Sequence, residues 1–163
     1  MKILFLANDG EGLFKFRKEL LKELLKDNDV FVSLPKDKYE KPLKELGCTF
    51  IETGFERKST NPLKDLQLLF FYRKLIRELR PDVVLTYTVK PNVYGGIACQ
   101  LEKTPYIVNI TGGVGSSPDD TGIVVKVVMQ LYEIGLRKAS TVFFQNNSNN
   151  VLLKLRVLLP YQF

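Results

Sequence analysis

The chain has 163 residues, of which 45% are hydrophobic and 26% are charged, a balance typical of an ordinary soluble globular domain. It contains no histidine, which excludes Ser-His-Asp and Cys-His nucleophile pairs and the usual histidine-containing zinc sites. The net charge of +6 permits attraction to phosphates or anionic membrane surfaces without demanding it, and we expect no nucleic-acid partner.

Cys48 and Cys99 stand alone in apolar contexts, so we expect two reduced, buried thiols and no cysteine metal site. No signal peptide is predicted, because only five apolar residues separate Lys2 from Asn8. No apolar run approaches the roughly 18 residues of a membrane span. We therefore expect a cytoplasmic protein.

Short apolar runs alternate with segments whose apolar residues recur at helical spacing. The first half predicts, in chain order, a strand at 3–7, a glycine-containing turn at 8–12, a helix at 13–26, a strand at 30–34, a short helix at 42–47 and a strand at 48–52. Phe16 and Leu20 are among the residues expected on the inner side of the first helix. Gly47 suits the end of the short helix.

The second half continues this alternation. Asn61 is the predicted N-cap, and Pro62 the first residue, of a helix that ends before Pro81. The later elements are a strand at 83–87, a small-residue helix at 92–102, a strand at 106–110, a loop at 111–121, a helix at 123–138 and a strand at 141–145. This repeat predicts a doubly wound, Rossmann-like parallel sheet of about six strands, in the order 3-2-1-4-5-6, with helices on both faces.

Residues 1–146 are predicted to form this domain, and residues 147–163 form a polar run followed by an apolar tail. The tail fits a last helix packed on the sheet, the start of a missing second domain, or a remnant of truncation.

Most of the unusual polar and glycine content follows the predicted strands. The segments are NDGEG, GFERKSTNP, TYTVKPN, NITGGVGS and QNN. Ligands of open parallel sheets bind at the carboxyl ends of the strands, so we expect the functional site at this edge.

Gly10 and Gly12 lie at a strand-to-helix turn, where backbone N–H groups suit an anion, although a tight turn also explains them. The dinucleotide pattern is incomplete, because Lys15 stands where its third glycine would fall. Arg17 either reaches back over this turn or covers apolar surface with its stem. Lys90 either pairs with a phosphate or carboxylate or is solvated.

The glycine-rich loop and the basic face of the first helix each allow two interpretations. The glycines after residue 111 form either a loop whose amides meet phosphate or sugar hydroxyls or a flexible connection. The basic residues of the first helix mark either a lipid-docking face or, with glutamates interleaved, an ordinary solvated face. These residues are Lys15, Arg17, Lys18, Lys22 and Lys26.

Six segments stand out in their order along the chain. They are MKILFLAND, FKFRKELLKELLK, RKSTNPLKDL, RPDVVLTYTVKPNVYGGIA, PYIVNITG and STVFFQN. Together they resemble the N-terminal domain of family-4 glycosyltransferases of the GT-B fold, in the branch that builds bacterial capsular, O-antigen and related polysaccharides. The resemblance covers roughly residues 1–146 and is most specific in TYTVKPNVYGG and NITG…VFFQN.

The resemblance implies transfer of a sugar from a nucleotide-sugar, expected to be a UDP-sugar, to a hydroxyl of a glycan or lipid-linked acceptor. It implies that this domain holds the acceptor, that a C-terminal domain holds the donor, and that no metal or tightly bound cofactor takes part. It also implies peripheral contact of the protein with the inner face of the membrane.

The resemblance also implies roles for particular residues. Those matching the donor-phosphate side of the cleft are Gly10, Gly12, Arg17 and Lys90. Those matching the acceptor side are Thr88, Asn92, Asn109, Thr111 and Gly112. Asp9 and Glu11 are the nearest carboxylates and hence the catalytic candidates, but the catalytic residue stays unassigned.

Three features depart from the family pattern: no residues remain for a donor half, the loop at 111–118 differs from the usual TGLG-aromatic pattern, and the resemblance fades after Asn146. The hypotheses are therefore an acceptor half that is inactive alone, or a non-catalytic or split-enzyme subunit needing a separate donor-binding chain. A third hypothesis is an unrelated nucleotide-binding Rossmann domain.

Overall fold

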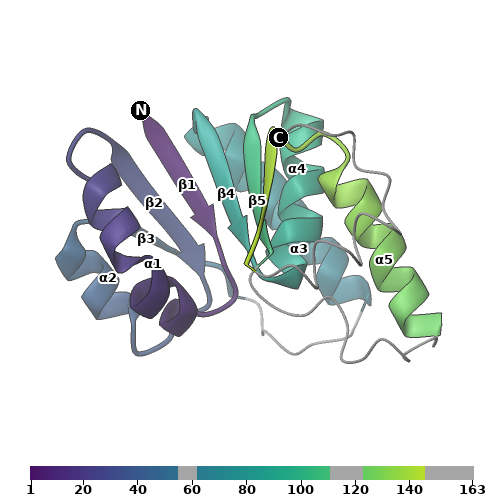
Figure 1. Cartoon of the computed structure of the whole chain (residues 1–163), viewed down its shortest axis with the longest axis horizontal. Helices are drawn as coiled ribbons and strands as arrows, with labels where there is room; N and C mark the ends of the chain where they lie inside the picture. The colour runs from purple at the N-terminus through teal and green to yellow at the C-terminus, as the bar shows by residue number, and fades with distance from the viewer. Residues whose placement is uncertain (55–61, 111–122, 146–163) are drawn as a thin grey trace.

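The structure, a computed structural model, describes residues 1–54, 62–110 and 123–145. Its centre is a parallel sheet of six strands in the order β3-β2-β1-β4-β5-β6 (Figure 1). The strands are β1 (Lys2–Leu6), β2 (Asp29–Leu34), β3 (Thr49–Glu52), β4 (Val83–Tyr87), β5 (Tyr106–Ile110) and β6 (Thr141–Phe144). The predicted fold class and strand order are confirmed. The predicted N-cap Asn61 and the tail at 147–163 lie outside the described residues.

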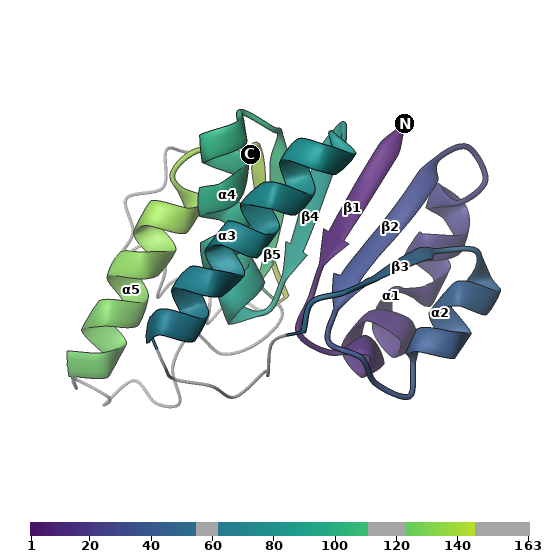
Figure 2. The same cartoon turned by 180° about the vertical axis from the view of Figure 1, so that it is seen from behind.

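Helices cover both faces of the sheet (Figures 1 and 2). They are α1 (Gly10–Leu24), α2 (Glu40–Leu46), α3 (Pro62–Leu79), α4 (Gly96–Glu102) and α5 (Ile123–Leu136), with a π-helical turn, η1 (Pro91–Gly95), before α4. The chain moves from β1 outward to β3 and then returns to β4 on the other side of β1. Right-handed crossovers therefore place α1 and α2 on one face and α3 to α5 on the other.

The central strand β1 divides the interior into two hydrophobic cores. Leu4 and Leu6 belong to the core beneath α3, α4 and α5, whereas Phe5 belongs to the core beneath α1 and α2. All three side chains are fully buried. Successive residues of a strand point to opposite faces, so this one strand anchors both helical layers.

Helix α1 begins three residues earlier than predicted, so the glycines at 10 and 12 are part of its first turn rather than of a loop. Its N-cap is Asp9, whose carboxylate accepts a hydrogen bond from the N–H of Gly12 at 2.6 Å. The buried stripe runs through Leu13 and Leu21. The prediction that Phe16 faces inward was wrong, because its position lies off this stripe and its side chain is 72% exposed.

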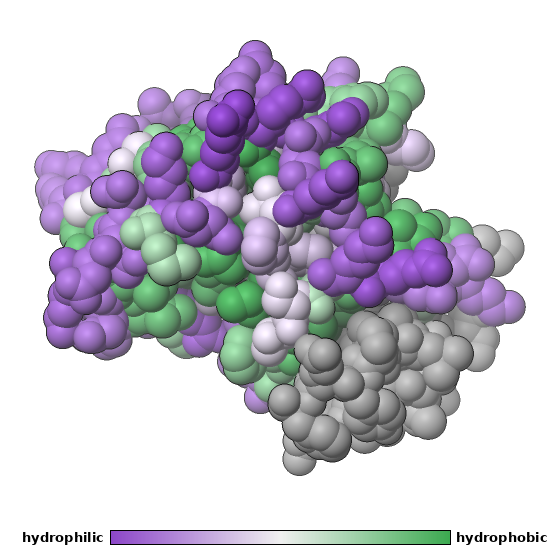
Figure 3. Space-filling model, turned by 90° about the horizontal axis from the view of Figure 1, so that it is seen from above, coloured by the Kyte–Doolittle hydropathy of each residue, from purple (hydrophilic) through white to green (hydrophobic). Residues whose placement is uncertain are grey.

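The outer face of α1 carries short ion pairs between residues three or four apart. The pairs are Lys15–Glu11, Lys22–Glu19 and Lys26–Glu23. Such pairing is typical of a solvated helix face. Figure 3, seen from above, shows hydrophilic side chains over much of that view with apolar side chains between them. No helix in the described part of the chain is long and apolar enough to span a bilayer.

The helix predicted at 92–102 instead opens with the π-helical turn η1. Its small residues were expected to let it approach the sheet, and a Cβ on Gly95 would indeed meet Leu6 of β1 at 2.8 Å. Gly96, by contrast, faces α5: a Cβ there would overlap the backbone carbonyl of Gly135. The glycine pair therefore lets two helices touch backbone to backbone.

Polar side chains reinforce this helix contact. The Tyr106 hydroxyl donates to the Gly135 carbonyl at 2.8 Å, and the Gln100 amide donates to the Ile134 carbonyl at 2.8 Å. The C-terminal carbonyls of a helix lack partners within the helix. Gln100 and Tyr106 satisfy two carbonyls near the end of α5 and hold it in place.

We predict that Gly96→Ala lowers the free energy of unfolding by about 1–3 kcal/mol, because the added methyl group meets backbone rather than a movable side chain. Urea denaturation followed by circular dichroism measures the change. Gln130→Ala, at an exposed position on α5, is the control and should leave stability nearly unchanged. Equal stability of wild type and Gly96→Ala would contradict the close contact.

The expectation of two free, buried cysteines is confirmed. Burial raises the pKa of the Cys48 thiol to about 11 and raises that of Cys99 further. Burial also raises the pKa of Tyr106 and of Tyr132 to about 12. These groups resist deprotonation only while the chain is folded.

We therefore predict that stability falls as the pH rises above about 9, where unfolded thiols ionise but folded ones do not. The unfolded state then binds fewer protons than the native state, so the free energy of unfolding decreases with pH. Urea denaturation at pH 8 and at pH 10.5 measures the slope. Cys48→Ala should show a shallower decrease, and an identical slope in both proteins would refute the assignment.

Candidate functional site

A pocket of about 500 Å³ opens at the carboxyl ends of the strands. It lies where the chain order of the sheet reverses, between β1 and β4, which is where doubly wound sheets bind ligands. The residues that line it are Ala7, Asp9, Glu11, Gly12, Leu13, Phe16, Arg17, Tyr87, Thr88, Val89, Asn92, Ile110, Tyr132 and Gln145. The sequence-based prediction of a site at this edge thus has a matching cavity.

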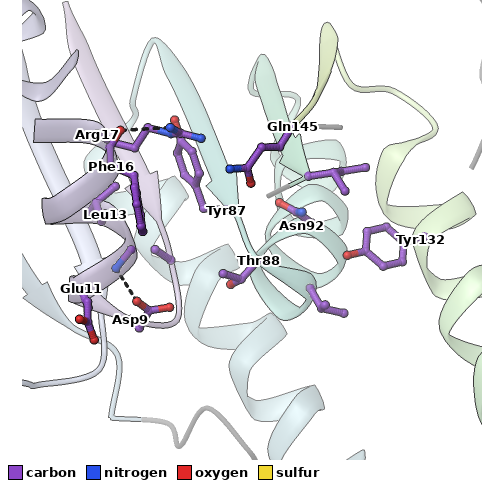
Figure 4. A pocket seen from close by; sticks show the side chains of 14 residues that line it. Asp9, Glu11, Leu13, Phe16, Arg17, Tyr87, Thr88, Asn92, Tyr132 and Gln145 are labelled. Atoms are coloured by element: carbon purple, nitrogen blue, oxygen red, sulfur yellow. Dashed lines mark hydrogen bonds between the residues drawn. The ribbon is translucent and has the colours of Figure 1, made fainter. Parts of the chain in front are cut away.

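Helix α1 supplies one wall of the pocket, which Figure 4 shows with Arg17, Phe16 and Glu11 along it. The Arg17 guanidinium lies 5.7 Å from the centre of the Tyr87 ring, and its Nη1 donates to the Phe16 carbonyl at 3.1 Å. Tyr87 in turn stacks on Phe5, with ring centres 5.9 Å apart. Burial raises the pKa of Tyr87, and the charge of Arg17 opposes that rise.

The two glycines predicted to meet donor phosphates have carboxylate partners in this structure. The N–H of Gly10 donates to Asp37 Oδ2 at 2.8 Å, and the N–H of Gly12 donates to Asp9. A Cβ on Gly10 would lie 2.7 Å from Asp37 Oδ1. Glycine at position 10 therefore serves a close approach between α1 and the segment after β2, and Gly10 is not on the pocket lining.

The two carboxylates proposed as catalytic candidates both line the pocket but already have partners. Glu11 forms an ion pair with Lys15 at 2.6 Å, which lowers the pKa of the Glu11 carboxyl. Asp9 caps α1. A general base is most effective with a pKa near the working pH, so the lowered pKa of Glu11 gives it no special suitability. The catalytic residue stays unassigned.

The opposite wall comes from the segment after β4 and from η1. Thr88 has a backbone φ of 71°, a left-handed conformation that is strained for a β-branched residue and that clusters at functional sites. Asn92 is 1% exposed, and its Nδ2 donates to the Asn109 carbonyl at 3.1 Å. The structure thus brings Thr88 and Asn92 to the pocket and sets Asn109 behind them. Thr111 and Gly112 lie outside the described residues.

Lys90 lies away from the lining and forms an ion pair instead. Its Nζ lies 2.6 Å from Asp65 Oδ1, and both side chains are only 18% exposed. The Tyr94 hydroxyl donates to the other carboxylate oxygen of Asp65 at 3.1 Å. Lys90 therefore ties the start of η1 to α3. Of the alternatives that the sequence left open for Lys90, a phosphate, a carboxylate or solvent, the structure shows a carboxylate, that of Asp65 within the chain.

Eight lining residues were not identified as site residues from the sequence, among them Tyr87, Tyr132 and Gln145. Tyr132 fitted the helix pattern, so nothing in the pattern separated it from core residues. Tyr87 stands in the collected strand-end segment TYTVKPN. Gln145 follows β6 and belongs to the collected strand-end segments, which was the available signal. Within the described residues, no group of three potential metal ligands lies together.

Residues 2–146 match the family described as "Glycosyl transferase 4-like". The chain belongs to this glycosyltransferase family. It is 32% identical over 154 residues to the N,N'-diacetylbacillosaminyl-diphospho-undecaprenol alpha-1,3-N-acetylgalactosaminyltransferase of Campylobacter jejuni. The match covers 91% of this chain and 41% of that enzyme, so the chain spans about two-fifths of the length of this curated relative. The family resemblance seen in the sequence is confirmed.

Solved structures share the fold at low sequence identity. Anabaena HepE in complex with UDP-glucose is similar with a TM-score of 0.69 and 18% identity, covering 96% of this chain and 40% of HepE. Acinetobacter baumannii MurG is similar with a TM-score of 0.62 and 16% identity, and the match covers 88% of this chain and 40% of MurG. The UDP-GlcNAc 2-epimerase of Methanocaldococcus jannaschii is similar with a TM-score of 0.65 and 15% identity, and the match covers 96% of this chain and 42% of the epimerase. The fold is that of one GT-B half.

We predict that Asp65→Asn lowers the free energy of unfolding by roughly 1–3 kcal/mol, because the poorly exposed Lys90 ammonium loses its carboxylate. Thermal and urea unfolding measure the loss. Glu23→Gln is the matched control, since it breaks the Lys26–Glu23 pair of the same 2.6 Å length at a well-exposed site. Equal effects of the two substitutions would contradict a structural role for the Asp65–Lys90 pair.

Proposed function

We propose that this domain is the acceptor-binding half of a GT-B glycosyltransferase that acts in bacterial polysaccharide biosynthesis. In the reaction, a sugar moves from a nucleotide-sugar, with UDP as the nucleotide, to a hydroxyl of a glycan or lipid-linked acceptor. The Campylobacter relative carries a lipid-linked acceptor in its name, which supports an acceptor of this class. No metal or tightly bound cofactor is part of the proposal.

The pocket at the sheet reversal carries this proposal. All of its lining residues lie within the stretch matched to the glycosyltransferase family, and it combines hydrogen-bonding side chains with apolar and aromatic ones. Among the lining residues, Arg17 is the cation, held against Tyr87 and the Phe16 carbonyl. The resemblance implies a donor-phosphate role for Arg17; we propose instead that its guanidinium, fixed beside an aromatic surface, binds the acceptor's phosphate group, which is attached to a sugar and a lipid.

The donor half of the cleft is proposed to come from another domain, either in a longer polypeptide or in a separate chain. On this view, residues 1–163 bind the acceptor but transfer no sugar by themselves. Stabilising the leaving diphosphate is the main electrostatic task of such a reaction, and the closed cleft would supply it. A split enzyme with a separate donor-binding chain is the alternative arrangement.

Peripheral contact with the inner face of the membrane is part of the same proposal. Phe16 is 72% exposed and Leu20 is 39% exposed on α1, beside the pocket. The lysines of this helix are largely paired with glutamates, so contact through α1 would rest on these apolar side chains more than on charge.

We predict that the 163-residue chain binds farnesyl-diphospho-N-acetylglucosamine more tightly than UDP-N-acetylglucosamine in calorimetric titrations. Arg17→Gln should weaken binding of the isoprenoid probe about tenfold, because a charged hydrogen bond to phosphate is lost. Lys15→Gln is the matched control on the same helix, since Lys15 is not on the pocket lining. A mixture of both compounds should yield no transfer product.

Two results would overturn the proposal. Tight binding of UDP-N-acetylglucosamine with no binding of the isoprenoid probe would indicate a nucleotide-binding Rossmann domain instead. Sugar transfer by the purified chain alone would contradict the assignment of this domain to the acceptor half only.

A further inference from the structure

Asn92 holds a buried hydrogen-bond acceptor without a partner. Its side chain is 1% exposed, and its Nδ2 donates to the backbone carbonyl of Asn109. That bond sets which end of the amide points to β5, and it leaves Oδ1 with no hydrogen-bond partner. Burying a polar atom without a hydrogen-bond partner destabilises the folded state by the full free energy of removing that atom from water. Such atoms in native proteins therefore need an explanation.

Thr88 carries a second unpartnered oxygen on the same side of the pocket. Its Oγ1 is buried and has no hydrogen-bond partner, although the residue itself is only partly buried. Its left-handed backbone adds strain at this point, and its carbonyl accepts from the Asn92 N–H at 3.0 Å. The backbone of Thr88 is thus bound to η1, while its buried hydroxyl has no hydrogen-bond partner.

Tyr132 of α5 lies on the same side of the pocket as Asn92 and Thr88, and the three residues form what we call the corner of the pocket. Figure 4 shows Thr88, Asn92 and Tyr132 on the side of the pocket away from the α1 wall. Burial raises the pKa of the Tyr132 phenol to about 12, and a side-chain hydrogen bond with Asn92 opposes part of that rise. The three side chains come from β4's end, η1 and α5, so they converge from separate elements.

The two sides of the pocket therefore offer different chemistry. The Arg17 guanidinium can only donate hydrogen bonds, which suits an anion. Asn92 Oδ1 can only accept, and a phosphate at neutral pH has little or nothing to donate to it, whereas a hydroxyl both donates and accepts. The corner of Thr88, Asn92 and Tyr132 consequently favours a neutral hydroxylated group over a phosphate.

We infer that Asn92, with Thr88 and Tyr132, forms a subsite that binds a hydroxyl of the acceptor sugar and orients the acceptor with its phosphate toward Arg17. Asn92 is the specificity-determining residue of this subsite: its Oδ1 accepts a hydrogen bond from the sugar hydroxyl. The inference rests on the proposed acceptor function and names how the sugar part of the acceptor is recognised.

The test compares two probes of equal charge, farnesyl-diphospho-N-acetylglucosamine and the terminal methyl ester of farnesyl diphosphate, in which a methyl group stands in place of the sugar. For the wild-type chain, calorimetric titration should give about tenfold tighter binding of the sugar-bearing probe. Asn92→Ala should abolish that ratio while leaving the affinity for the methyl ester unchanged. A merely structural effect would weaken both probes together, so the ratio separates the two roles.

Asn28→Ala is the matched control, because Asn28 also donates from Nδ2 to a backbone carbonyl, that of Leu24, but is not on the pocket lining. Its ratio should equal that of the wild type. Tyr132→Phe removes a single oxygen and should reduce the ratio in part. Circular dichroism checks the fold of each variant, and if Asn92→Ala fails to fold, Tyr132→Phe and Thr88→Ala carry the test.

An unchanged ratio in the folded variants would overturn the inference, since these polar atoms would then hold water rather than a sugar hydroxyl. Equal binding of both probes to the wild type would overturn it too, while leaving acceptor binding through the phosphate intact. Failure of the wild type to bind either probe would instead remove the proposed function itself.

Discussion

The backbone contact between Gly96 and Gly135 fixes how closely α4 and α5 pack, and with it the position of one wall of the pocket. No side chain separates α4 from α5 there, so the distance between the helices is set by the two main chains themselves. Tyr132 lies one turn before Gly135, and Asn92 lies about one turn before Gly96. A shift of either helix would therefore carry both side chains away from each other, and the corner of the pocket with them.

The pocket joins two walls of unlike origin. One wall is a regular helix whose first turn is capped by carboxylates, and the other is a strained residue followed by a π-helical turn. π-helical turns and left-handed non-glycine residues both recur at functional sites. The regular wall presents the guanidinium of Arg17, whereas the irregular wall presents uncharged polar atoms. Of the two walls, the one that presents uncharged polar atoms is thus the one with the irregular backbone.

The sequence predicted the elements best where the apolar pattern was local. The limits of β4 and β5 were correct to the residue, because each is a short apolar run closed by polar residues. The start of α1 was missed because part of what holds it comes from Asp37, 27 residues away. The partner of Lys90 could not be named from the sequence for the same reason, since Asp65 lies 25 residues earlier. Contacts between distant segments leave no mark in a local pattern.

The division of the interior by β1 has a consequence for how such a protein can change over generations. Leu4 and Leu6 pack on one side, and Phe5 on the other, so the two helical layers share a strand but few side chains. Substitutions beneath α1 can reshape the wall that carries Arg17 without disturbing the packing that supports Asn92. A scaffold built in this way is open to adaptation one wall at a time, because the wall that carries Arg17 and the wall that carries Asn92 rest on separate cores.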